Sequence, residues 1–205
     1  MEERLSDFTA ALASVAPAPG GGGAAAVMGA LAASLGAMAS GIAAARKSAE
    51  DPARLSDAAE RFEKLRLGFL ALIEADAAAF LPLSAAYALP RDTPGRADTL
   101  RRASLDACAA VERLLRLGHE TAALLKGVQP LIPRLLLSDL GCAAASCRAA
   151  LLSAAYNILI NIRPYPEDAE AQRLRSLVNG ALRVDTPALE CIERLVLAGL
   201  GGETL

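Results

Sequence analysis

Apolar residues recur along almost the whole chain at the three- and four-residue spacing that is typical of α-helices. Prolines, glycines and charged turns divide this pattern into predicted helices over residues 2–15, 23–47, 52–89, 96–126, 139–162, 166–182 and 187–199. Two of them, 23–47 and 139–162, are apolar on nearly all faces, which is typical of central helices. The pattern therefore predicts an all-α fold, a single-domain helical bundle of about six to seven helices over residues 1–205.

The amino-acid composition supports the prediction of helices and argues against a nucleic-acid partner. Alanine and leucine together fill 82 of the 205 positions, whereas valine and isoleucine together fill only 14. Alanine and leucine favour helices and β-branched residues favour strands, so this balance argues against a sheet. The net charge of −2 provides no broad basic surface, and we therefore expect no nucleic-acid partner.

The cysteines and the single histidine do not suggest a metal site. Cys108, Cys142, Cys147 and Cys191 form no pair at the spacing of zinc ligands, and His119 lies far from most of them. Each cysteine lies among alanines and leucines, where a reduced thiol serves as a small apolar filler. We expect buried, reduced thiols and a cytoplasmic location, and the acidic start of the chain does not resemble a secretory signal. His119 is interpreted as a structural or surface residue.

The stretch between Asp7 and Arg46 carries no charge and is long enough to cross a bilayer. It consists mostly of Ala, Gly and Ser, however, so it gains little from contact with lipid. We interpret it as a helix packed inside protein and expect no membrane association. Because a helix that is apolar on all sides must be covered, we predict a homodimer in which small-residue helices meet across a two-fold axis.

A run of glycines, Gly20, Gly21, Gly22 and Gly23, directly precedes the second predicted helix. Glycines let the backbone bend sharply and approach a ligand, and the amino end of a helix favours an anion. The run differs from a nucleotide-binding P-loop, because no Lys-Ser or Lys-Thr pair follows it. It indicates either a ligand-binding turn or a tight turn that permits close helix contact.

Asp76 is an unusual residue for the middle of a predicted helix, and it shares a face with Phe80, Leu83 and Tyr87. A carboxylate on such an apolar face would be partly desolvated, which raises its pKa toward the range of a general acid or base. The alternative is an Asp that faces solvent beside Glu74. Tyr87 is expected either to donate a hydrogen bond to a substrate or simply to pack.

Further polar residues stand at the two ends of the predicted helix 139–162. Ser138 and Asp139 are both leading N-cap residues, so capping explains one of them and leaves the other for a ligand. Near the other end, Asn157 and Asn161 lie four residues apart and therefore on one face, with Arg163 just beyond. Amides in an apolar helix need partners, which can be backbone groups or a polar heterocycle.

These features occur in a specific order, as Pro17 to Gly22, Arg46-Lys47, Asp76 to Phe80, Ala86 to Pro90, Ser138 to Gly141 and Asn157 to Ile162. In this order they resemble the cyclodeaminase/cyclohydrolase family. That family includes the C-terminal domain of formiminotransferase-cyclodeaminase and the stand-alone bacterial methenyltetrahydrofolate cyclohydrolases. The resemblance covers roughly residues 5–195, and no single motif would suffice for it.

The resemblance implies an all-helical homodimer that binds a reduced folate without a metal or nucleotide cofactor. Family members either close 5-formiminotetrahydrofolate to the 5,10-methenyl form with loss of ammonia, or hydrolyse the 5,10-methenyl form to 10-formyltetrahydrofolate. A carboxylate can stabilise the cationic carbon centre of both reactions and shuttle protons. Asp139 is the first choice for that carboxylate and Asp76 the second. The glycine turn with Arg46, Lys47 or Arg163 is expected to hold the anionic glutamyl tail.

Three positions depart from the residues that are usual in the family. Gly23 stands where Ser or Thr is usual, Ile42-Ala43 where Leu-Thr is usual, and Pro133-Arg134-Leu135 where Gly-Asn and further polar residues are usual. An alternative to a folate enzyme is therefore a non-catalytic member of the same fold, or a member that binds another small molecule or a partner. The sequence leaves open the choice between cyclohydrolase and cyclodeaminase.

Overall fold

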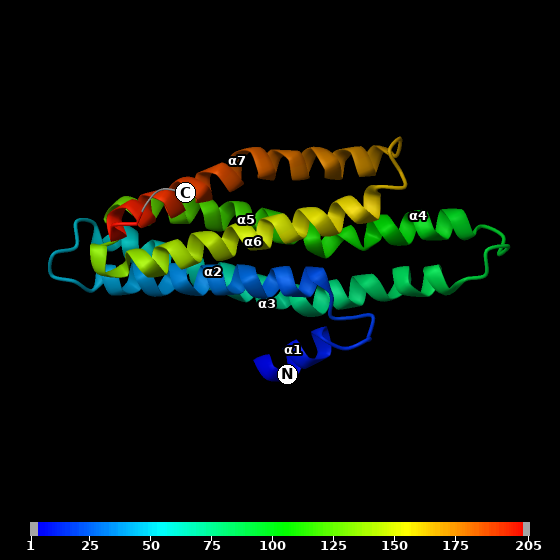
Figure 1. The fold of residues 1–205 in the computed structure, drawn as a ribbon, viewed down its shortest axis with the longest axis horizontal. Helices are drawn as coiled ribbons and strands as arrows, with labels where there is room; N and C mark the ends of the chain where they lie inside the picture. Colours follow the sequence, from blue (N-terminus) through cyan, green and yellow to red (C-terminus); the bar gives the residue numbers. More distant parts are fainter. Residues whose placement is uncertain (1–3, 203–205) are drawn as a thin grey trace.

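Long α-helices make up the structure, a computed structural model that describes residues 4–202 of the chain. The α-helices are α1 (Leu5–Leu12), α2 (Gly21–Ala44), α3 (Pro52–Ala88), α4 (Arg96–Asp106), α5 (Cys108–Val128), α6 (Leu137–Ile162) and α7 (Ala169–Leu200). Two short 3-10 helices, Gln129–Leu131 and Arg134–Leu136, connect α5 to α6. Figure 1 shows the long helices side by side along one axis, so the all-α prediction is confirmed.

Helix α2 packs against α3, α5 and α6, and its buried residues are all Gly, Ala or Ser. Three of its glycines recur at seven-residue spacing and each faces a side chain of α3 that recurs at the same spacing. The pairs are Gly36 with Phe62, Gly29 with Phe69 and Gly22 with Asp76. A Cβ atom on Gly29 would lie 2.4 Å from the Phe69 ring, and one on Gly36 would lie 2.7 Å from the Phe62 ring. The α3 side chains therefore rest directly on the α2 backbone, which requires glycine at these positions.

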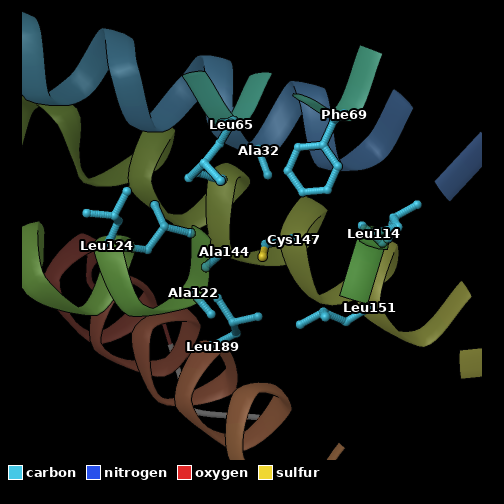
Figure 2. Packing of buried hydrophobic residues seen from close by; sticks show 14 of the residues in the cluster. Ala32, Leu65, Phe69, Leu114, Ala122, Leu124, Ala144, Cys147, Leu151 and Leu189 are labelled. Carbon is cyan, nitrogen blue, oxygen red and sulfur yellow. The ribbon is translucent and has the colours of Figure 1, made fainter. Parts of the chain in front are cut away.

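The hydrophobic core lies where α2, α3, α5, α6 and α7 converge, and Figure 2 shows its centre. Alanines of α2 and α6 alternate there with larger side chains such as Leu65, Leu114 and Leu151. Cys147 lies in the middle of this cluster, and burial raises the pKa of its thiol to about 12. Cys108 is also buried, but Cys142 and Cys191 are exposed, so the prediction that all four cysteines are buried is wrong for these two.

Several predicted helix boundaries need correction. Helix α1 covers Leu5–Leu12, so it ends before the predicted residue 15, and residues 2 and 3 of the predicted helix 2–15 lie outside the described residues. Helix α2 begins at Gly21, so most of the glycine run is helical, and it ends at Ala44, which leaves Arg46 and Lys47 beyond its last turn. The small residues of α2 allow α3 to approach closely from the first turn onward. This packing outweighs the low helix propensity of glycine and sets the start of α2.

Two predicted breaks are also different in the structure. The predicted helix 96–126 is divided at Ala107 into α4 and α5, whereas the two predicted helices 166–182 and 187–199 are one continuous helix, α7. Pro187 lies inside α7 and removes the hydrogen bond to the carbonyl of Arg183. Pro187 and Arg183 are both exposed, so water can satisfy that carbonyl, while Leu189 on the other side of the helix is fully buried. Packing therefore outweighs the proline.

Ion pairs tie α7 to the rest of the bundle. Arg173 of α7 bonds Glu112 of α5, and Arg148 of α6 bonds Glu193 of α7 with an Nε–Oε1 distance of 2.9 Å. Hydrogen bonds from Arg173 and Arg116 lower the pKa of Glu112 to about 2. Glu112 therefore remains ionised at neutral pH, and the outer faces of α5 and α7 are charged.

The outer surface of α2 and α6 has a different character, because it is apolar. Leu31, Met38 and Ile42 of α2 and Tyr156 and Ile160 of α6 are all at least two-fifths exposed. By length and composition alone, three stretches could cross a membrane: α2, α3 and the segment Arg134–Ile162. The α2 and α6 surface is thus an apolar face with no cover in a single subunit.

We predict that Gly29→Ala lowers the free energy of unfolding by roughly 1–3 kcal/mol, because the added methyl group collides with the Phe69 ring. Gly180→Ala is the matched control, since a Cβ atom there meets no atom within 4 Å. This change is expected to be neutral or to stabilise α7 by up to about 1 kcal/mol. Denaturant unfolding followed by circular dichroism measures both. Equal destabilisation by the two substitutions would contradict the proposed close packing of α2 and α3.

Candidate functional site

A cavity of about 190 Å³ lies where α2 begins, between the loop that precedes α2 and the helices α3, α5 and α6. It combines the glycine run, the predicted carboxylate of α3 and the predicted amides of α6. Its lining residues are Pro17, Ala18, Gly20, Gly21, Gly22, Asp76, Phe80, Ala107, Val111, Asn157, Ile160 and Asn161. The structure therefore brings together residues from three of the sequence motifs, which are far apart along the chain.

Among residues 4–202, Asp76 is the only carboxylate that lines this cavity. Its side chain rests against Gly22, where a Cβ atom would lie 2.1 Å from Asp76 Oδ1. Burial raises the pKa of Asp76 above its ordinary value, and a hydrogen bond from the backbone N–H of Gly23 partly offsets this rise. The predicted desolvated environment of Asp76 is thus present, as expected for a carboxyl group that serves as a general acid or base.

The amino end of α2 directs backbone N–H groups toward the same cavity. The first intrahelical bond of α2 runs from Ala24 N to Gly20 O at 3.0 Å, so the N–H groups of Gly21, Gly22 and Gly23 have no partner within the helix. No side chain caps this end. Together with the helix dipole, these groups favour an anion or a partial negative charge of a ligand.

Asn157 and Asn161 contribute side-chain amides from α6. Asn157 Nδ2 donates to the carbonyl of Ser153 at 2.8 Å, which leaves Asn157 Oδ1 as an acceptor near Gly21. Asn161 hydrogen-bonds the Cys108 thiol, whose pKa is raised to about 11 by burial. The predicted shared face of the two asparagines is confirmed by their common place in the cavity wall.

The chemistry of this cavity suits one kind of ligand group. It offers a carboxyl group, backbone donors and amide groups, and Phe80, Val111 and Ile160 supply apolar walls. Within the part of the chain that the structure describes, no Lys, Arg or His lines it. A flat heterocycle that carries or develops positive charge can stack on the apolar walls, present its polar edge to the amides and have its charge stabilised by Asp76.

Ser138 and Asp139 do not line this cavity, so within one subunit the first choice for the carboxylate, Asp139, lies apart from the second, Asp76. Asp139 precedes Asn157 by 18 residues of α6, which separates them by about 27 Å along the helix. Ser138 lines a separate shallow groove between α6 and α7. Neither residue caps α6, because Leu136 occupies the N-cap position and no side-chain cap bond forms. The Ser138-Asp139 pair was a candidate because it resembles a family motif. The sequence alone, however, does not show that the opposite end of α6 is the one that lies at the cavity.

The predicted cations and Tyr87 also lie outside the cavity. Arg46 and Lys47 follow the far end of α2, about 36 Å along the axis from its glycines. Arg163 is the exposed residue that follows α6, just beyond Asn161. Tyr87 is 57% exposed and lies 11 residues after Asp76, or about 16 Å further along α3. Within one subunit, none of these side chains lines the wall around Asp76.

Several lining residues carry no signal that sequence analysis can find. Ala107 and Val111 belong to the predicted helix 96–126 and reach the cavity only because α5 packs behind α2. Phe80 lines the cavity on the face that it was predicted to share with Asp76. Ile160 could have been found in the same way, because it lies three residues after Asn157 and therefore on the same helical face. The other lining residues reach the cavity through contacts between helices that are far apart along the chain.

A larger groove of about 510 Å³ lies between α5 and α7. His119 lines it and its Nδ1 atom lies 2.8 Å from Oδ1 of the buried Asp185, so His119 has a structural partner on the surface, as predicted. This groove contains none of the predicted site residues. We therefore assign the functional site to the smaller cavity at the start of α2. Among residues 4–202, no three His, Cys, Asp or Glu side chains are grouped to hold a metal ion.

Comparisons with known proteins identify the family to which the chain is related. Residues 4–179 match the family model described as formiminotransferase-cyclodeaminase. The chain is 34% identical to the methenyltetrahydrofolate cyclohydrolase of Methylorubrum extorquens, over 85% of this chain and 87% of that protein. It is 28% identical to the formimidoyltransferase-cyclodeaminase of Rattus norvegicus, over 89% of this chain but only 35% of that longer protein.

A solved structure gives the same result for the fold. The crystal structure of formiminotetrahydrofolate cyclodeaminase from Thermotoga maritima superposes with a TM-score of 0.80 at 25% identity, covering 98% of this chain and 96% of that chain. The predicted resemblance is therefore confirmed by the family model, by a relative and by a structure. With its helical bundle and a match over residues 4–179, the chain belongs to the formiminotransferase-cyclodeaminase family.

Proposed function

We propose that this protein is a folate one-carbon enzyme, a methenyltetrahydrofolate cyclohydrolase or a formiminotetrahydrofolate cyclodeaminase, and that Asp76 carries the proton in its reaction. The observation that supports this most is the half-buried carboxyl group of Asp76, which rests on Gly22 beside the free N–H groups of α2. The relative in Methylorubrum extorquens, which matches over most of its own length, makes cyclohydrolase activity the first to test.

One carboxyl group can serve both reactions with balanced protons. In the hydrolysis, water adds to the cationic methenyl carbon and loses a proton to the Asp76 carboxylate. The bond from that carbon to N5 then breaks as Asp76 returns the proton to N5, and the remaining hydroxyl proton leaves to solvent. In the deamination, N10 adds to the carbon of the protonated formimino group, and Asp76 transfers the N10 proton to the formimino nitrogen, which departs as ammonia and leaves the methenyl cation. Burial raises the pKa of Asp76 above that of an ordinary aspartate, which favours a carboxyl group that can return the proton it has accepted.

The size and lining of the cavity fit the reacting end of such a substrate. Its volume of about 190 Å³ is below the roughly 300–1,000 Å³ of sites that enclose a whole drug-sized ligand. It can therefore hold the heterocyclic head, while the remainder of a folate lies outside it. The asparagine amides are placed to bind the polar edge of the head, and Phe80 provides an apolar surface.

The surroundings of the reaction are part of the proposal. We propose that it needs no metal or nucleotide cofactor, because Asp76 and the backbone donors already supply the proton and the charge stabilisation. We also propose a cytoplasmic protein that binds neither nucleic acid nor a membrane. Its charged faces on α5 and α7 suit water, and its net charge of −2 provides no general attraction to nucleic acid.

We expect Asp76→Asn to lower kcat for hydrolysis of 5,10-methenyltetrahydrofolate by about 10²- to 10⁴-fold, because an amide cannot accept and return the proton. The loss of substrate absorbance in the near ultraviolet measures the rate. The acidic limb of the wild-type pH profile should lie above the ordinary aspartate pKa of about 4, since burial raises the pKa of Asp76. Glu74→Gln, an exposed carboxylate on the same helix, is the control that retains activity. Unchanged turnover in Asp76→Asn would exclude Asp76 as the proton carrier.

We expect Gly22→Ala to reduce activity at least about 10²-fold, because the new methyl group occupies the place of the Asp76 carboxylate and displaces it. Gly41→Ala in the same helix is the control, since a Cβ atom there meets nothing within 4 Å. Steady-state kinetics of the two variants, with their helix content checked by circular dichroism, make the comparison. Equal activity of the two variants would show that the contact between Gly22 and Asp76 is dispensable.

We further propose a homodimer that buries the apolar face of α2 and α6. Light scattering at micromolar concentration should give twice the chain mass of 21.1 kDa. Leu31→Glu should produce monomers, because it places a charge in the proposed interface, whereas Leu195→Glu on the exposed surface of α7 should leave the dimer intact. A wild-type protein that remains monomeric under these conditions would contradict the dimer.

A further inference from the structure

The groove between α5 and α7 contains an ionisable group that the proposed reaction does not use. Asp185 lies on the inner face of α7 and is only 4% exposed. Burial and, to a smaller degree, the charge of Asp185 raise the pKa of the Cys147 thiol to about 12, so Asp185 lies beside the core. An apolar residue would fill this position without the cost of removing a carboxylate from water. Packing alone therefore does not explain Asp185.

The hydrogen-bonding partner of Asp185 is the imidazole of His119 on α5. Nδ1 of His119 lies 2.8 Å from Oδ1 of Asp185, and within residues 4–202 no other group hydrogen-bonds this carboxylate. A carboxylate accepts hydrogen bonds, so Nδ1 carries the proton and Nε2 of the neutral ring has the free lone pair. The His119 side chain is 62% exposed and lines the groove. Asp185 therefore fixes one tautomer and holds an imidazole with an acceptor at Nε2 in the groove wall.

The charged residues that line the groove leave it negative. Its one lining arginine belongs to a chain of ion pairs in which two positive and two negative charges cancel, formed by Arg116, Glu112, Arg173 and Glu170. Glu120 also lines the groove, is exposed, and forms no ion pair among the residues that the structure describes. The charges that remain in the lining are those of Asp185 and Glu120. The groove therefore offers acceptors and negative charge to a ligand.

The remainder of the groove is apolar and has room for an organic molecule. Leu115 of α5 and Leu177, Ala181 and Val184 of α7 line it. A Cβ atom on Gly180, between these residues, would meet no atom within 4 Å, so the wall is open there. The volume of about 510 Å³ lies within the roughly 300–1,000 Å³ of small-molecule sites. The groove therefore suits a small molecule with a flat apolar body better than an inorganic ion.

We propose that this groove is a second binding site, for a small organic cation whose apolar body packs between α5 and α7 and whose protonated nitrogen donates to His119 and Glu120. Asp185 is a positioning residue that acts through His119. An ammonium or amidinium group supplies the donors and the positive charge that the groove lacks. A carboxylate ligand is repelled by Glu120. The groove shares no lining residue with the cavity at the start of α2, so this site does not depend on the proposed function.

A matched set of indoles tests the preference for a cation. Tryptamine carries an ammonium group, indole is uncharged and indole-3-acetate carries a carboxylate, whereas the apolar body is the same in all three. The chain contains no tryptophan, so the anisotropy of indole fluorescence reports the ligand alone. We expect tryptamine to bind saturably and roughly tenfold more tightly than indole, and indole-3-acetate to bind more weakly than indole. Equal binding of all three, or no saturable binding of tryptamine, would overturn the proposal.

His119 is the single histidine of the chain, so its imidazole resonances show where tryptamine binds. Heteronuclear NMR should show the tautomer that is protonated at Nδ1, and tryptamine should shift the Nε2 resonance.

Substitutions in the groove test the same location. His119→Gln and Glu120→Gln should each weaken tryptamine binding roughly tenfold, whereas Glu60→Gln, which changes an exposed carboxylate of α3, should not. Glu120→Gln alters only an exposed side chain, so it keeps the test valid if His119→Gln does not fold. Asp76→Asn should retain the binding. Tryptamine binding that is lost in Asp76→Asn but persists in Glu120→Gln would place the ligand in the cavity at the start of α2 and reject the second site.

Discussion

The close contact between the glycines of α2 and the side chains of α3 is the constraint on which the rest of this structure depends. The glycines and their α3 partners both repeat every seven residues, so three α3 side chains rest in turn on the α2 backbone. Two of these side chains are phenylalanine rings in the core, and the third is Asp76 at the end of the series. The packing that stabilises the bundle thus also places and desolvates the candidate catalytic carboxyl group.

The position of Gly22 explains why this last contact has chemical consequences. Gly22 belongs to the first turn of α2, where backbone N–H groups lack intrahelical partners, and the N–H of the next residue bonds Asp76. Burial raises the pKa of Asp76 and that hydrogen bond lowers it, so the carboxyl group is held between two opposing effects. Deeper in the bundle, the same contact would bury an ionisable group without access to a ligand. At the start of the helix it opens into a cavity.

The sequence predicted what depends on local pattern and missed what depends on packing. Helical periodicity was enough to predict the all-α fold, and the poor fit of Asp76 to an apolar face was enough to make it a candidate. The continuation of α7 through Pro187 was missed, because burial of Leu189 outweighs the local signal. The sequence did not reveal that Asp139 lies far along α6 from Asn157 and from the cavity of its own subunit, because that separation depends on the fold. The seven-residue repeat of Gly22, Gly29 and Gly36 is visible in the sequence and could have identified the partner helix.

The central claim is that the reacting end of a reduced folate binds between Asp76 and the first turn of α2. A crystal structure of the protein with 5-formyltetrahydrofolate tests this most directly. We predict that the heterocyclic ring lies within hydrogen-bonding distance of the Asp76 carboxyl group and against the backbone of Gly21 and Gly22. A folate bound only in the larger groove beside His119, with nothing in the cavity at the start of α2, would contradict the claim.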